Sequence, residues 1–118
     1  MRMKKRAIAT IAIVASLLSY GTASAQSVTT SSVIPVTQVY TGWHSDVWGI
    51  GNGGAAITNP ANCSATDAYY SDGTDPGNKN YLAQALTAFN SGAHVIVIVS
   101  NTTCTQNRPT IYGLILTQ

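Results

Sequence analysis

Three neighbouring residues, His44, Ser45 and Asp46, are of the types that a hydrolytic triad uses. The members of a triad must converge in space, whereas adjacent residues of a strand point to opposite faces. His94 could supply a distant base, but no feature of the sequence marks Ser45 as activated. The chain has four aspartates and no glutamate, and they form no recognisable acid–base pair. We therefore predict a protein that is not an enzyme.

Two further patterns bear on cofactors. His44, Asp46 and His94 could hold a metal only if the fold united them, and we expect ordinary surface histidines and no metal. Residues 49–54 (GIGNGG) match the dinucleotide pattern GxGxxG. That pattern needs a helix directly after it, and residues 55–60 (AAITNP) offer none. We expect a glycine-rich turn or bulge there, and no cofactor.

Aromatic side chains are the better candidates for ligand binding, and we single out Tyr40, Trp43, Trp48, Tyr69 and Tyr70. Flat rings beside Asn and Ser suit sugars, because a pyranose has an apolar face and a polar edge. The alternative is that these rings build the core, where aromatic residues bury much area each. Trp43 and Trp48 flank a predicted tight connection, so we expect one of them to be exposed at its tip.

Two cysteines, Cys63 and Cys104, stand 41 positions apart. A lone pair in an oxidising compartment is most simply a disulfide. A metal pair or a redox-active thiol is the alternative, but the chain has no CxxC motif. Closing a loop of this size stabilises a small domain by roughly 3–4 kcal/mol if loop entropy dominates.

The first 25 residues have the pattern of a secretory signal peptide. A basic start precedes an apolar run over residues 7–18, and residues 23–25 (ASA) fit a cleavage site. The run is short for a membrane span, which needs roughly 20 residues, so an N-terminal anchor is the weaker alternative. The short basic leader is typical of bacteria, so we expect a periplasmic or secreted protein with no other membrane-spanning segment.

Without the leader, we expect residues 26–118 to form one small β-rich domain. It carries Lys79 and Arg108 against four aspartates, a net charge of −2. Nucleic-acid binding needs clustered basic residues, so we exclude nucleic acid as a partner.

Periodicity along the domain predicts five strands and one helix. Strands are expected over residues 33–43, 46–50, 65–71, 94–99 and 110–117, with polar, non-strand segments at 26–32 and 101–109. The helix is expected to begin with Asn78 as its cap, or with Asp75 as the cap and Pro76 as the first residue, and to end at Gly92. Its apolar stripe is expected to be Leu82, Ala85, Leu86 and Phe89.

This order predicts a mainly β fold with one helix (α+β). One helix cannot cover both faces of a five-stranded sheet, so we expect a small five-stranded OB-like barrel or curved sheet with one disulfide, Cys63–Cys104.

A set of segments resembles a group of small secreted bacterial proteins. They are residues 59–63 (NPANC), 69–70 (YY), 78–88 (NKNYLAQALTA) and 95–99 (VIVIV), followed by Cys104, Pro109 and residues 111–116. The element order also resembles the B subunits of AB5-type toxins. That likeness implies an OB-fold with a helix between the third and fourth strands, glycan binding, and assembly into a ring.

The sequence therefore predicts a secreted, non-enzymatic binding module. Its expected partner is a surface glycan, and a homo-oligomer is compatible with this interpretation. The alternative is a structural domain of the bacterial envelope that binds a protein.

Overall fold

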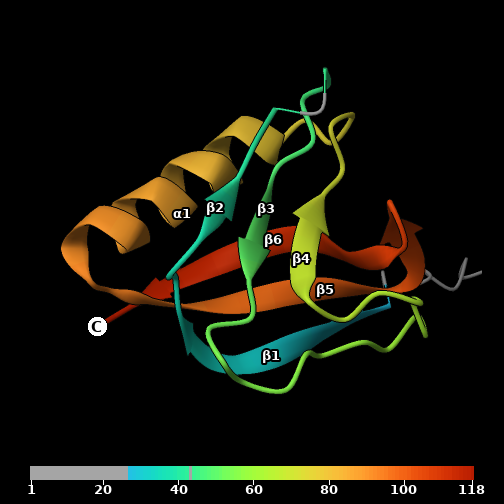
Figure 1. The fold of residues 1–118 in the computed structure, drawn as a ribbon, viewed down its shortest axis with the longest axis horizontal. Helices are drawn as coiled ribbons and strands as arrows, with labels where there is room; N and C mark the ends of the chain where they lie inside the picture. The colour runs from blue at the N-terminus through green and yellow to red at the C-terminus, as the bar shows by residue number, and fades with distance from the viewer. Residues whose placement is uncertain (1–26, 43) are drawn as a thin grey trace, which may run out of the picture.

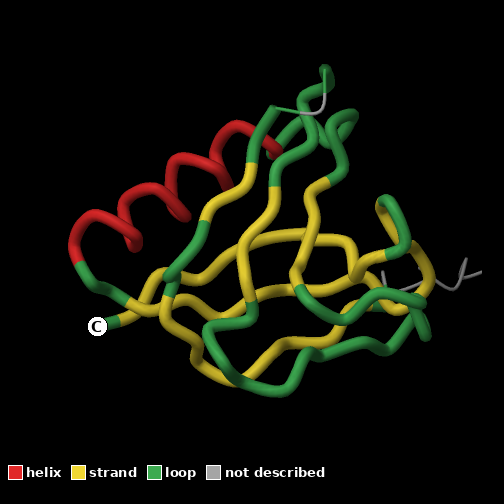
Figure 2. Tube along the Cα trace, in the orientation of Figure 1, coloured by secondary structure: helices red, strands yellow, loops and turns green. Residues whose placement is uncertain are grey.

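The computed structural model describes residues 27–42 and 44–118. The predicted signal peptide and Trp43 lie outside the described residues. The elements are β1 (Val28–Pro35), β2 (Val39–Tyr40), β3 (Gly49–Gly51), β4 (Ala68–Ser71), α1 (Asn78–Ser91), β5 (His94–Thr105) and β6 (Arg108–Thr117). The predicted fold class, mainly β with one helix, is confirmed (Figures 1 and 2).

The strands form one open mixed sheet in the order β1-β5-β6-β4-β3-β2. Only the β4–β6 pair is parallel among the pairs of the described residues. The two edge strands, β1 and β2, are consecutive in the chain and are joined by residues 36–38 alone. The chain therefore passes directly from one edge of a strongly curved sheet to the other. The expected curved sheet is confirmed, and the OB-like barrel given as its alternative is not formed, because the sheet is open. The expected number of five strands is wrong, because the first strand is broken into β1 and β2.

Strand β1 overturns the prediction that residues 26–32 are a loose polar entry segment. It pairs with β5, and the register shifts between Thr30 and Val33. At this bulge the Ser31 hydroxyl accepts a hydrogen bond from the backbone N–H of Val97 at 2.9 Å. A polar side chain therefore replaces a missing ladder bond, which is why a Ser/Thr-rich segment can complete a sheet.

A two-residue hairpin overturns the prediction of a polar loop at 101–109. Gln106 and Asn107 both have positive φ, 46° and 66°, and join β5 directly to β6. Two successive left-handed residues give the turn whose twist matches antiparallel strands. The strands can therefore continue through polar sequence up to the turn.

Strand β3 is shorter than expected. Only Gly49–Gly51 pairs, whereas residues 46–48 of the expected strand precede it as irregular chain. The glycine-rich run that follows is a turn, as predicted: Gly53 and Gly54 have φ of 62° and 81°.

Helix α1 begins and ends almost as predicted. Gly92 adopts φ of 74° and its N–H donates to the Ala88 carbonyl at 3.0 Å, which ends the helix. Gly77, not Asn78, occupies the N-cap position, and no side chain caps the helix there. The Asp75 carboxylate accepts the N–H of Gly77 at 2.7 Å instead.

The side of the helix that faces the sheet differs from the expected stripe. Ala85 and Ala88 are fully buried, whereas Leu86 and Phe89 are 42% and 50% exposed. Tyr81 and Leu82 pack against the core and are half-buried. Burial, together with the nearby Asp75 carboxylate, raises the pKa of Tyr81. Small alanines let the helix backbone approach the strands closely, which turns the larger Leu86 and Phe89 outward.

The core lies inside the curve of the sheet, and α1 covers one side of it (Figure 1). Its fully buried large side chains are Ile34, Trp48, Ile50, Tyr69, Val95, Val97, Val99 and Ile111. Ala55 and Ile57 pack against this core from the long connection between β3 and β4. Within the described ranges, no helix is long and apolar enough to cross a bilayer.

The predicted disulfide between Cys63 and Cys104 is confirmed, with the two Cα atoms 5.7 Å apart. It ties the segment before β4 to the end of β5, beside the β5–β6 hairpin. The bond holds together two segments that are 41 positions apart.

Candidate functional site

The four aromatic candidates that the structure describes differ in how much of each side chain is exposed. Trp48 and Tyr69 lie in the core. We expected one of Trp43 and Trp48 to be exposed: Trp48 is only 1% exposed, and Trp43 lies outside the described residues. The Tyr69 hydroxyl accepts the N–H of Thr58 at 2.8 Å, which fixes the long loop to the core. Tyr40 is half-buried and Tyr70 is 5% exposed. Neither Trp48 nor Tyr69 therefore offers a ring face to a ligand at the surface.

Trp48 is held by hydrogen bonds to two elements. Its indole N–H donates to Asn78 Oδ1 at 2.7 Å and to the Asn78 backbone carbonyl at 3.2 Å. Its backbone N–H donates to the Ser71 hydroxyl at 3.0 Å, and its carbonyl accepts the N–H of Ser71 at 2.7 Å. The Asn78 amide nitrogen also donates to the Asp46 carbonyl at 2.8 Å. The start of α1 is thereby fastened to the segment that leads into β3.

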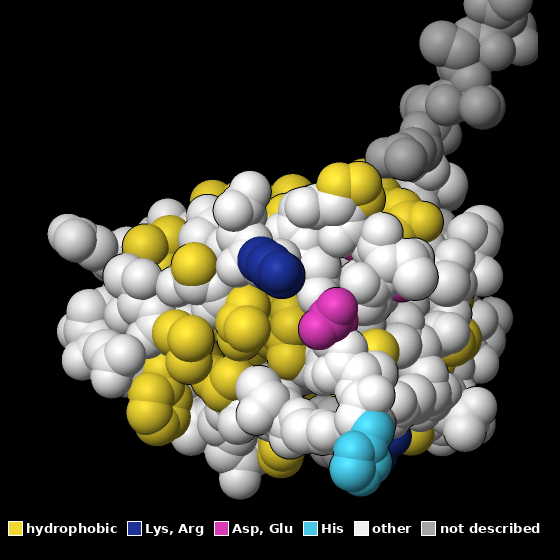
Figure 3. Space-filling view, turned by 90° about the horizontal axis from the view of Figure 1, so that it is seen from above, with side chains coloured by type: hydrophobic (Ala, Val, Ile, Leu, Met, Phe, Trp, Pro, Cys, Tyr) yellow, Lys and Arg dark blue, Asp and Glu magenta, His cyan; other side chains and the backbone are white. Residues whose placement is uncertain are grey.

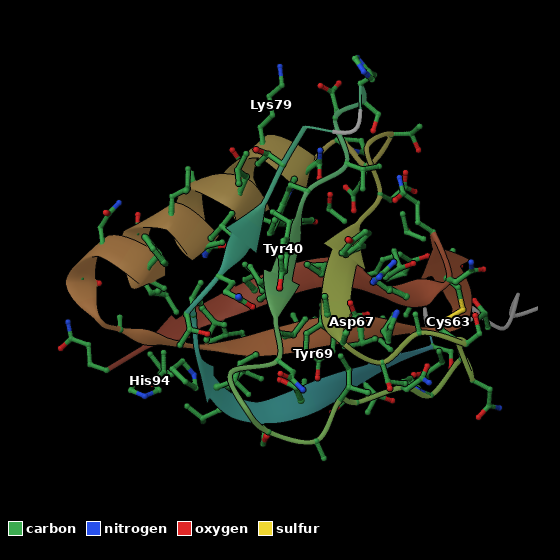
Figure 4. The ribbon with its side chains drawn as sticks, in the orientation of Figure 1. Tyr40, Cys63, Asp67, Tyr69, Lys79 and His94 are labelled. Carbon is green, nitrogen blue, oxygen red and sulfur yellow. A yellow bond between two sulfur atoms is a disulfide. The ribbon has the colours of Figure 1, made fainter. Side chains whose placement is uncertain are left out.

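A cavity of about 300 Å³ lies where these parts meet. We call it the loop–helix pocket. Its lining residues are Thr41, Ser45, Asp46, Val47, Trp48, Asn78, Lys79 and Leu82. Figure 4 shows Lys79 projecting from the start of α1 near the chain that precedes β3. Its volume lies at the lower end of the range for small-molecule sites.

The pocket combines an apolar floor with a polar rim. Val47 and Leu82 are its accessible apolar side chains, because Trp48 is only 1% exposed. Ser45, Asp46 and Lys79 are exposed and bring a hydroxyl, a carboxylate and an ammonium group. Such a site can hold a small ligand that has one apolar face and several hydrogen-bonding groups.

The residues considered for catalysis or metal binding do not gather here. Ser45 and Asp46 line the pocket, but His94 starts β5, far from it in the fold (Figure 4). Among the residues that the structure describes, no three His, Cys, Asp or Glu side chains are placed to hold a metal ion.

Tyr40 and Tyr70, unlike the other candidates, lie next to each other. Their ring centroids are 6.5 Å apart, and the Arg108 guanidinium lies over the Tyr70 ring at 4.6 Å. Tyr70 is paired with Gly49 across β3 and β4, and the absence of a side chain at Gly49 leaves room for its ring. We call Tyr40, Tyr70, Arg108 and Asp67 the tyrosine cluster.

Arg108 in this cluster is occupied by structural contacts. Its Nε and Nη2 donate to the two Asp67 carboxylate oxygens at 2.7 and 3.0 Å, and Nη1 donates to the Gln106 carbonyl at 3.2 Å. The hydrogen bond lowers the pKa of Asp67 and raises the pKa of Arg108. The cluster therefore braces the hairpin against β4, and the loop–helix pocket is the better candidate for ligand binding.

Sequence reasoning missed most residues of the pocket. Thr41 and Lys79 carried no signal, and Asn78 and Leu82 were assigned only to the helix. Lys79 stands 33 or more positions after the segment 41–46, so only the folded chain brings them together. Comparison with known proteins finds no family model, no curated protein and no solved structure that matches this chain.

Proposed function

We propose that this protein is a secreted, non-enzymatic carbohydrate-binding domain and that the loop–helix pocket holds the sugar. The observation that carries the proposal is the composition of this pocket: the half-buried apolar side chains of Val47 and Leu82 stand beside the exposed polar side chains of Ser45, Asp46 and Lys79. A pyranose ring presents an apolar face and a hydroxyl-bearing edge, which complement these two parts.

Secretion is supported by the leader pattern of residues 1–25 and by the disulfide, since structural disulfides persist in oxidising compartments. The fold itself favours no particular ligand, because the sheet is open and does not form the OB-like barrel that binds oligosaccharides and oligonucleotides. The four aspartates against two basic residues of the domain favour the sugar over the polyanion. Many functions occur on such folds, so the pocket carries more weight than the topology.

The test is a glycan array probed with residues 26–118, with the disulfide formed. A glycan that binds is then titrated calorimetrically against Ser45→Ala and Lys79→Ala. Loss of a hydrogen bond to a charged group weakens binding by about tenfold or more, so we expect that loss for Lys79→Ala and a smaller one for Ser45→Ala.

Asn80→Ala is the matched control, because Asn80 is exposed on the same helical turn and does not line the pocket. Binding unchanged in all three variants would move the site elsewhere. Tyr40→Ala then asks whether the tyrosine cluster is that site. An array without any bound glycan would refute the proposal.

A further inference from the structure

Three apolar side chains follow one side of α1, from Leu82 at the edge of the core to Phe89 at the surface. They are Leu82, Leu86 and Phe89, spaced four and three residues apart, which places them on one side of a helix. Leu86 is 42% exposed and Phe89 is 50% exposed, whereas Leu82 is half-buried. We call these three residues the helix stripe. Figure 3 shows hydrophobic side chains gathered on this face, beside a basic side chain.

The helix stripe begins inside the loop–helix pocket. Leu82 lines the pocket, and Lys79, three residues earlier on the same side of α1, lines its polar rim. From Leu82 the stripe runs over seven residues, which is about 10 Å along the helix axis. The polar site and the apolar surface are therefore one continuous feature.

Charged side chains lie at the pocket and are absent from the helix stripe. Lys79 and Asp46 stand at the pocket end, and residues 80–107 contain no Asp, Glu, Lys or Arg. A ligand that used the whole feature would need a polar head for the pocket and an uncharged, apolar tail for the stripe.

We infer that the ligand of the loop–helix pocket is an amphiphile, a glycoside whose apolar aglycone lies along Leu82, Leu86 and Phe89. This inference rests on the proposed function. Three side chains that are half-exposed or less supply far less than the about 800 Å² that a stable protein partner needs on each side. At the helical rise of about 1.5 Å per residue, the stripe is about 10 Å long, which is the length of an extended alkyl chain of roughly eight carbons.

The size of the effect follows from partial burial. A methylene that lies on a surface loses about half of its contact with water, so each one strengthens binding about twofold. We expect the gain to stop where the stripe ends, since carbons beyond Phe89 meet water.

The experiment titrates residues 26–118 with n-alkyl β-glucosides and β-maltosides that carry butyl, hexyl, octyl or decyl chains, each below its micelle concentration. Affinity should rise about 16-fold from butyl to octyl, because four methylenes contribute about twofold each, and change less than twofold from octyl to decyl. In Leu86→Ser and Phe89→Ser the affinity should depend little on the length of the alkyl chain. Both residues are largely exposed, so the variants retain the fold, which circular dichroism verifies.

Val33→Ser is the matched control, because Val33 is 54% exposed on β1 and lies outside the pocket and the stripe. It should leave the chain-length series unchanged. A series altered equally by Val33→Ser would overturn the assignment to the stripe.

The outcomes separate this inference from the proposed function. Glycans that bind on the array, together with a flat chain-length series, overturn the amphiphile and leave carbohydrate binding in place. If affinity rises with chain length equally for fatty acids, and no glycan binds on the array, the ligand needs no sugar. That result overturns the proposed function. A silent array together with a flat series overturns both.

Discussion

Asn78 is the residue whose removal should most affect the junction between α1 and the segment before β3. Its side chain is 5% exposed and makes two hydrogen bonds, accepting from the Trp48 indole at 2.7 Å and donating to the Asp46 carbonyl at 2.8 Å. Asn78→Ala removes both. Each is worth about 1 kcal/mol net, and a buried partner left unsatisfied adds to the cost.

In Asn78→Ala, the Trp48 indole and the Asp46 carbonyl each keep another hydrogen-bond partner. The Trp48 indole keeps the Asn78 backbone carbonyl at 3.2 Å, and Asp46 is exposed, so water can reach its carbonyl. The unsatisfied penalty is therefore small, and we expect a loss of about 2–3 kcal/mol in the free energy of unfolding. Asn78→Asp keeps the acceptor for the indole but sets a carboxylate oxygen against the Asp46 carbonyl in a buried position, so it should not recover the stability that Asn78→Ala loses.

Urea unfolding with the disulfide intact, followed by tryptophan fluorescence, measures this loss. With a slope of about 1–3 kcal/mol per molar urea, the midpoint for Asn78→Ala should fall by roughly 1–2 M. Asn80→Ala is the control at an exposed position on the same turn, and it should change stability by about 0.5 kcal/mol or less. If Asn78→Ala and Asn80→Ala have the same midpoint, the junction does not depend on Asn78 and the reasoning is wrong.

Three other perturbations test the rest of the fold. In Gly49→Ala the added Cβ would lie 2.5 Å from Cδ1 of Tyr70, so we expect a loss of about 1–3 kcal/mol; an unchanged melting temperature would mean that the ring can move aside. The Arg108 hydrogen bond lowers the pKa of Asp67 below its ordinary value of 3.8, so this carboxylate contributes stability that is present above that pH and is lost as the pH falls through the lowered pKa. Wild-type protein should therefore lose stability below about pH 4 more steeply than Asp67→Asn, by less than about 1 kcal/mol because the pair is exposed, and parallel acid titrations of unfolding would contradict this. Reducing the disulfide opens a loop of 41 positions and should cost about 4 kcal/mol by loop entropy, measured as the shift in urea midpoint with and without reductant.

Local signals in the sequence were sufficient for several elements. Gly92 ends α1 because a left-handed residue is needed there, and glycine adopts that conformation without strain. The apolar run of residues 94–99 is a strand, and the two cysteines form a disulfide. Each of these features depends on the conformational preference or the composition of residues that are close together in the sequence, so it can be predicted without knowledge of the fold.

Long-range contacts decided what local patterns could not. Strand β1 is polar and forms because β5 offers it a partner and Ser31 completes the ladder. Trp48 is buried because Asn78, thirty positions later, receives its indole N–H.

The sequence alone determined the class of fold, the extent of the helix and the pairing of the cysteines, because each follows from residues whose local preference is strong. Tertiary structure decided which side of α1 faces outward, which rings are buried and where a pocket lies. The physical reason is that burial depends on what packs against a residue. Leu86 and Phe89 have the same local pattern as a core stripe, and they are exposed because Ala85 and Ala88 occupy the contact with the sheet.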